Sequence, residues 1–160
     1  MQFEQYKFKF YLNANHAIRI SGSLGQVHPH TWEISIVAVN TNHTFVRFDD
    51  METLVDKMFD QYQGKMINDV DPFDTINPTL ENMCEVFQER IEEILKIRGW
   101  ELRRIEVSET PARSYVMTFV DSVKTVSQEP APDTMDKEMR EQRVTQIINE
   151  YLHPENSILL

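Results

Sequence analysis

Three of the chain's five histidines, His16, His28 and His30, lie close together in the sequence. His28 and His30 are separated by one residue, so on an extended strand both side chains leave the same face. If the segment that contains His16 pairs antiparallel with that strand, the third imidazole can join them. Three neutral imidazoles on a rigid sheet can hold a divalent metal, most simply zinc, and leave a fourth position for water or substrate. The spacing therefore predicts a metal site, although His-x-His pairs also arise in ordinary surface strands.

The segments that carry these histidines have the pattern of strands. Residues 3–20 and residues 31–40 both alternate apolar with polar side chains. Residues 21–25 separate them and hold two of the chain's four glycines. Two long strands joined by a short glycine-bearing loop indicate an antiparallel ribbon.

Two helices and two further strands follow the ribbon. Apolar residues recur at helical spacing over residues 51–62 and again from Leu80 to about Arg98, with Gly64 and Gly99 ending the two runs. Asn77-Pro78 resembles an N-cap followed by a first-turn proline for the second helix. Residues 102–110 and 114–123 then alternate as strands. This order predicts an α+β fold, in which a four-stranded antiparallel sheet carries two helices on one face.

The length of 160 residues predicts one domain with a small appendage. We expect that domain over residues 1–123, a proline-containing linker over 124–133, and a C-terminal helix and tail over 134–160. The hydrophobic content of 41% is sufficient for a real core.

The charge and the cysteine content exclude several classes of protein. A net charge of −10 argues against nucleic-acid binding, which draws on clustered Lys and Arg. No apolar run approaches the length of a membrane span, and the N-terminus lacks the pattern of a signal peptide. The single cysteine, Cys84, excludes an internal disulfide and fits a cytoplasmic protein. Because Cys84 lies on the apolar stripe of a helix, we expect a buried, inert thiol.

Four short runs in order resemble the 6-pyruvoyltetrahydropterin and 6-carboxytetrahydropterin synthase family. They span about residues 5–121 and match the family's Phe-x-Ala-x-His, His-Gly-His, Pro-Thr-x-Glu-Asn and strand-terminal Glu-Thr. The runs are Leu12-Asn13-Ala14-Asn15-His16, His28-Pro29-His30, Pro78-Thr79-Leu80-Glu81-Asn82 and Val107-Ser108-Glu109-Thr110. Each run alone is weak, but their order makes the set fairly specific.

The resemblance implies the tunnelling fold, a homo-oligomer that is usually a hexamer, and zinc on His16, His28 and His30. It also implies that Glu109 anchors a pterin ring, because a carboxylate can accept two parallel N–H bonds. By the same resemblance Thr79 helps to hold the pterin. Each residue also has a purely structural interpretation. Glu109 can be a surface ion-pair partner of a nearby arginine, and Thr79 can satisfy the backbone donors of a first helical turn.

The departures from the family concern proton transfer. The family's catalytic cysteine precedes its His-x-His pair, whereas here Leu24 stands four residues before His28 and Ser23 is the nearest hydroxyl. The family's Asp-His pair aligns with Gln63-Gly64. Three hypotheses follow. The first is a zinc-dependent, lyase-like pterin synthase with altered proton-transfer groups, acting on dihydroneopterin triphosphate or a related dihydropterin. The second is a catalytically inactive pterin-binding or regulatory relative, and the third is a structural domain with a coincidental histidine cluster.

Overall fold

A computed structural model describes residues 4–42 and 46–119 of the chain. The predicted linker over 124–133 and the predicted C-terminal helix over 134–160 lie outside the described residues. The domain boundaries drawn from the sequence therefore stay a prediction.

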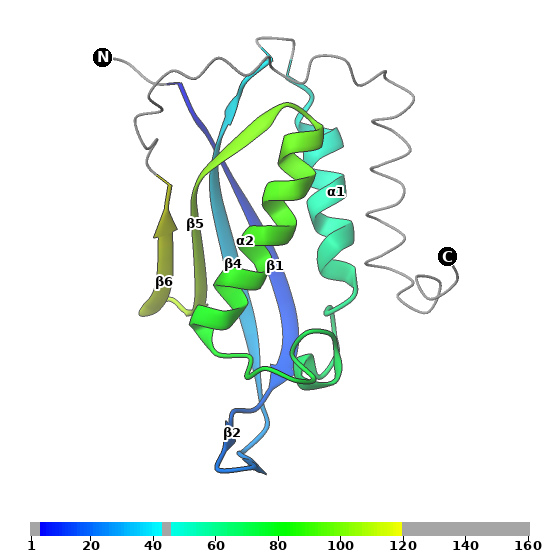
Figure 1. Ribbon diagram of the computed structural model, residues 1–160, viewed down its shortest axis with the longest axis vertical. Helices are drawn as coiled ribbons and strands as arrows, with labels where there is room; N and C mark the ends of the chain where they lie inside the picture. Colours follow the sequence, from blue (N-terminus) through cyan, green and yellow to red (C-terminus); the bar gives the residue numbers. More distant parts are fainter. Residues whose placement is uncertain (1–3, 43–45, 120–160) are drawn as a thin grey trace, which may run out of the picture.

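The described chain forms a four-stranded antiparallel sheet in the order β1-β4-β5-β6 (Figure 1). The strands are β1 (Tyr6–His16), β4 (His28–Asn40), β5 (Trp100–Thr110) and β6 (Arg113–Thr118). Between β1 and β4 the chain makes a small ribbon of β2 (Arg19–Ile20) and β3 (Ser23–Leu24). The α+β fold with a four-stranded antiparallel sheet, predicted from the sequence, is confirmed.

Both helices, α1 (Phe48–Asp60) and α2 (Leu80–Ile97), lie on one face of this sheet (Figure 1). A single 3-10 turn, η1 (Ile67–Asp69), interrupts the segment between them. The prediction that Asn77 caps α2 is wrong, because the N-cap is Thr79, whose hydroxyl accepts a hydrogen bond from the backbone N–H of Asn82 at 3.2 Å. The Asn77 side chain instead bonds the backbone of Arg19.

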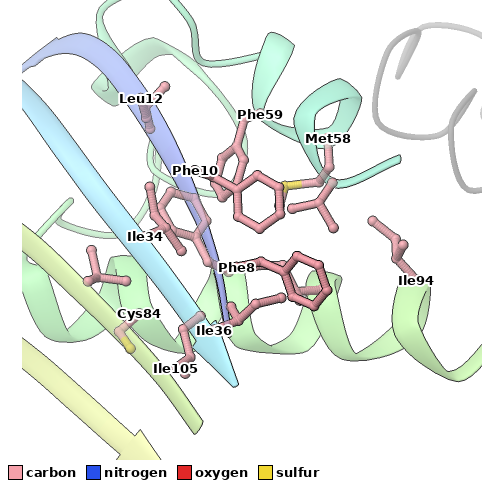
Figure 2. Packing of buried hydrophobic residues seen from close by; sticks show 14 of the residues in the cluster. Phe8, Phe10, Leu12, Ile34, Ile36, Met58, Phe59, Cys84, Ile94 and Ile105 are labelled. Carbon is pink, nitrogen blue, oxygen red and sulfur yellow. The ribbon is translucent and has the colours of Figure 1, made fainter. Parts of the chain in front are cut away.

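The core lies between the helices and the helix-facing side of the sheet. Alternate residues of β1, from Phe8 to Ala14, point into it and meet the apolar stripes of α1 and α2 (Figure 2). Cys84 is part of this core and is fully buried, as predicted (Figure 2). Burial raises the pKa of the Cys84 thiol to about 12, so it is protonated at neutral pH and is not a nucleophile.

The register of β1 on β4 determines where the histidines fall. His16 pairs with His28, Ala14 with His30 and Leu12 with Trp32. Since β5 pairs with β4 only from Glu33 onward, the β1–β4 ribbon extends beyond the rest of the sheet. The core-facing row of side chains therefore ends in a group of imidazoles at one end of the molecule.

Candidate metal centre

The three histidines singled out in the sequence converge on one point. The ring centroids lie 4.6 Å apart for His16 and His28, 5.1 Å for His16 and His30, and 4.8 Å for His28 and His30. One ring nitrogen of each lies within 4.8 Å of the corresponding nitrogens of the other two. His16 is buried and the other two are partly buried. Such a group has the donors of a three-histidine metal site.

Two backbone carbonyls determine which ring nitrogens carry hydrogen. His16 Nδ1 donates to the carbonyl oxygen of Pro78 at 3.0 Å, and His28 Nδ1 donates to that of Gln26 at 2.9 Å. A carbonyl oxygen only accepts, so in each neutral ring the hydrogen is on Nδ1 and the lone pair is on Nε2. This arrangement, in which a carbonyl holds the far side of the ring, is usual for metal-ligating histidines.

The two lone-pair nitrogens face each other. His16 Nε2 lies 3.0 Å from His28 Nε2. Two lone pairs at this separation repel unless a proton or a cation lies between them. In a tetrahedral zinc site with bonds of 2.0–2.1 Å, neighbouring nitrogens are about 3.3 Å apart. The donor set and its spacing therefore fit zinc.

The surroundings of His16 favour its neutral form, which is the form that ligates a metal. Burial is the main cause that lowers the pKa of His16 from 6.5, and positive charge on His28 and His30 lowers it further. The hydrogen bond to Pro78 and the negative charge of Glu109 oppose this shift but do not reverse it. His16 is therefore neutral at pH 7.

Trp32, which was not predicted as a site residue, forms a wall of the histidine group. Its ring centroid lies 4.9 Å from that of His16 and 5.1 Å from that of His30, and the side chain is fully buried. Its Nε1 has no hydrogen-bond partner among the described residues. The signal was available, since Trp32 follows His30 by two residues and so shares its face of β4.

Glu109 stands at the end of β5, where the pairing with β6 shifts register between Ser108 and Thr110. Its side chain is 15% exposed, and Arg113, which is 70% exposed, forms an ion pair with it at 3.2 Å. Arg103 and Arg104 instead pair with Glu101 and Glu106. Because β4 Glu33 pairs with Ser108, Glu109 comes level with Trp32, and its charge acts on His16. The Glu109 carboxylate therefore lies at the same end of the sheet, and on the same face, as the three histidines.

Thr79 lies in the turn that leads into α2. Its hydroxyl is engaged in the cap of that helix, through the N–H of Asn82. The preceding residue, Pro78, supplies the carbonyl that holds His16. The turn therefore connects the start of α2 to the candidate metal centre, and the helix cap helps to fix that carbonyl.

The positions that the resemblance aligns with proton-transfer groups have other surroundings here. Leu24 and Ser23 lie on β3, in the exposed ribbon. Gln63 Oε1 accepts a hydrogen bond from the N–H of Asn13 at 2.6 Å, and its Nε2 donates to the Tyr11 carbonyl at 3.2 Å. The N–H of Gly64 donates to the Asn13 carbonyl at 2.6 Å. Gln63 and Gly64 thus close the outer edge of β1 at Tyr11 and Asn13.

Comparisons with known proteins agree on one relationship. A family model described as 6-pyruvoyl tetrahydropterin synthase matches residues 5–119. The solved structure of 6-pyruvoyl tetrahydropterin synthase from Caenorhabditis elegans has a TM-score of 0.61 and 14% identity, covering 73% of this chain and 96% of that chain. The enzyme from Plasmodium vivax has a TM-score of 0.51 and 13% identity, covering 72% and 98%. No curated protein sequence matches this chain. At these identities the structural likeness concerns the fold.

Proposed function

The chain belongs to the 6-pyruvoyl tetrahydropterin synthase family, and from this premise we propose that it is a zinc-binding pterin synthase-like enzyme with altered proton-transfer groups. Its substrate in this proposal is dihydroneopterin triphosphate or a related dihydropterin. The observation that carries the proposal is the pair of facing Nε2 atoms of His16 and His28, 3.0 Å apart, each held by a carbonyl on its Nδ1.

In this proposal His16, His28 and His30 hold the zinc. Held by these three ligands, zinc would act as a Lewis acid toward an oxygen of the substrate. Trp32 packs against the rings of His16 and His30 and limits their rotation. The Pro78 and Gln26 carbonyls keep the ligating nitrogens free of hydrogen.

We assign substrate binding to Glu109 and Thr79. A carboxylate can accept two parallel N–H bonds from a pterin ring, in the manner of an arginine fork. The Glu109 carboxylate is largely buried beside the histidine group, and its partner Arg113 is mostly exposed, so the ring could replace the arginine at little cost. Thr79 contributes by its place in the turn next to Pro78.

A second function, a catalytically inactive pterin-binding or regulatory relative, is favoured by a specific observation. Leu24 has no ionisable group, and Gln63 and Gly64 bond the β1 backbone. Neither the Leu24 nor the Gln63 side chain can abstract a proton from carbon near neutral pH, and Gly64 has no side chain. The two functions share the metal and the carboxylate and differ only in turnover.

Zinc-loaded protein incubated with dihydroneopterin and its triphosphate tests the proposal, with pterins separated by chromatography and bound pterin followed by fluorescence. The variants are His30→Ala and Glu109→Gln, with Glu106→Gln as a matched control, because Glu106 is also an ion-paired glutamate of β5. We expect a new pterin product that both variants lose and the control keeps. If the protein binds pterin but forms no product, and only Glu109→Gln loses that binding, the chain is an inactive, pterin-binding relative. Less than about a tenth of an equivalent of zinc would refute the metal assignment.

The partners in this proposal are the pterin and further copies of the chain. No helix in the described parts of the chain has the length and apolar character needed to cross a membrane. A homo-oligomer, by the family resemblance a hexamer, would cover the outer edge of β6 and the part of β1 that precedes Tyr11. Light scattering after size-exclusion chromatography tests this directly, and a monomer at all concentrations would contradict it.

A further inference from the structure

The backbone that follows His16 receives its hydrogen bonds from side-chain amides. The N–H of Ala17 donates to Asn68 Oδ1 at 2.9 Å, and Asn68 Nδ2 donates back to the Ala17 carbonyl at 2.8 Å. Two residues on, the N–H of Arg19 donates to Asn77 Oδ1 at 2.7 Å, and Asn77 Nδ2 donates to the Arg19 carbonyl at 2.9 Å. Each amide thus pairs with one residue through both of its polar atoms.

These two asparagines act in place of a neighbouring strand. β1 ends at His16 and β2 begins at Arg19, so the chain between them leaves the long β1–β4 pairing. In extended chain, residues two apart present their N–H and C=O groups on the same side. Ala17 and Arg19 are such a pair, and Asn68 and Asn77 meet them in turn. The two amides thereby supply hydrogen-bond partners to the backbone beyond the last paired residue of β1.

The segment from Asn68 to Pro78 also holds the His16 ring. The Arg19 guanidinium donates to the backbone carbonyls of Asn68, Phe73 and Ile76 at 3.1, 2.9 and 3.1 Å, which ties residues 68–77 to the chain after His16. The next residue is Pro78, whose carbonyl accepts from His16 Nδ1. One segment therefore fixes both the backbone beside His16 and the orientation of its ring.

Asn68 is the asparagine that bonds the residue next to His16. It is 3% exposed, and Ala17, which it pairs, is fully buried. Without the amide, the buried N–H and C=O of Ala17 would lack partners, and the backbone would rearrange to satisfy them. His16 is the adjacent residue, so its ring would move with that backbone.

We propose that Asn68 is a positioning residue for the metal centre: its two hydrogen bonds to Ala17 hold His16 ready to ligate. This inference rests on the proposed zinc site and adds a residue outside the ligand set. Groups that orient a ligand change metal affinity because a loosened ligand must be ordered when the metal binds. A residue that only stabilises the fold lowers the stability of the protein with and without metal alike, and leaves the zinc dissociation constant of the folded protein unchanged.

The experiment compares Asn68→Ala with Gln63→Ala. Gln63 is a matched control, because its side-chain amide also makes two hydrogen bonds to the edge of β1, but at Tyr11 and Asn13. The readouts are the zinc dissociation constant, by competition with a chromogenic chelator, and the d–d absorption spectrum of the cobalt-substituted protein. We expect Asn68→Ala to weaken zinc binding roughly 10- to 100-fold and to alter the cobalt spectrum. Gln63→Ala should stay near the wild-type value in both.

A zinc dissociation constant for Asn68→Ala equal to that of the wild type, or an equal loss in Gln63→Ala, would overturn the inference. If Asn68→Ala does not fold, Asn68→Asp replaces it, because the carboxylate keeps the acceptor for the Ala17 N–H and loses only the donor. An unchanged zinc affinity in that folded variant would overturn the inference equally. Failure of the proposed zinc site looks different, since the wild-type protein itself would then not bind zinc.

Discussion

His16 should make the stability of the metal-free protein depend on pH. Burial lowers the pKa of His16 below 6.5 in the folded protein, whereas the unfolded chain takes up a proton near 6.5. Below pH 6.5 the unfolded state therefore binds more protons, and the free energy of unfolding falls as the pH falls. One proton contributes at most about 1.4 kcal/mol per pH unit, and the fall ends at the folded pKa. Above pH 6.5 both states are neutral and the contribution is constant.

The perturbation that isolates this effect is His16→Asn. An asparagine Nδ2 lies close to the position of histidine Nδ1, so the variant keeps a donor for the Pro78 carbonyl but has no titrating ring. Between pH 7.5 and 5.5 we expect the wild type to lose up to about 1.4 kcal/mol more unfolding free energy than the variant, the amount for one unit below 6.5. The carboxylates whose pKa values are shifted, Glu33 and Asp56, are common to both proteins and cancel in the difference.

Urea unfolding followed by far-ultraviolet circular dichroism, in the presence of a chelator at pH 7.5, 6.5 and 5.5, measures this difference. Unchanged slopes with urea concentration would show that the two proteins expose similar surface on unfolding. If the wild type and His16→Asn had the same pH dependence, His16 would not be held neutral in the folded protein. A wild type that gains stability relative to the variant at pH 5.5 would reverse the sign and refute the reasoning outright.

Three further predictions concern the framework around the site. Phe87→Ala should lower the unfolding free energy by about 3–5 kcal/mol, because Phe87 is fully buried and its ring lies 5.1 Å from that of Phe59 and 5.6 Å from that of Tyr62. Urea unfolding measures this loss, and a loss below about 1 kcal/mol would contradict the packing. Thr79→Ala should lose about 1 kcal/mol in the same assay and Thr79→Ser much less, because the serine hydroxyl can still cap α2; equal losses would argue against the cap. Cys84, with a pKa of about 12, should not react with a thiol reagent at pH 8 until urea unfolds the protein, and rapid labelling of the folded protein would show that it is accessible.

The strands and the histidine cluster could be predicted from the sequence because both depend on local periodicity. His28 and His30 had to share a face of β4, and a short connection had to return the chain antiparallel, which brings His16 to His28. The helices followed from apolar spacing in the same way. The apolar stripe of α2 also located Cys84 in the core.

The parts that the sequence could not predict depend on contacts far apart in the chain. Asn77 has the residue type of an N-cap, but its amide is taken by Arg19, 58 positions away, and Thr79 caps α2 instead. The register shift at Glu109 has no local signal in Ser-Glu-Thr, since it arises in the pairing with β6. Likewise, nothing near Gln63 indicates that its side chain completes the edge of a strand 50 residues earlier.

The proposed metal ligands and the positions that the family resemblance aligns with proton-transfer groups belong to different parts of the fold. His16, His28 and His30 lie on β1 and β4. The Pro78 and Gln26 carbonyls hold the rings of His16 and His28, and the Asn68 amide bonds the backbone that follows His16. Leu24 lies on the exposed β2–β3 ribbon and is 52% exposed. Gln63 makes its hydrogen bonds to β1 before the histidine. The hydrogen bonds that hold the His16 and His28 rings come from Pro78 and Gln26 and not from Leu24, so these bonds do not depend on a particular residue type at Leu24. The retained histidines are therefore evidence for metal binding and not, by themselves, for turnover.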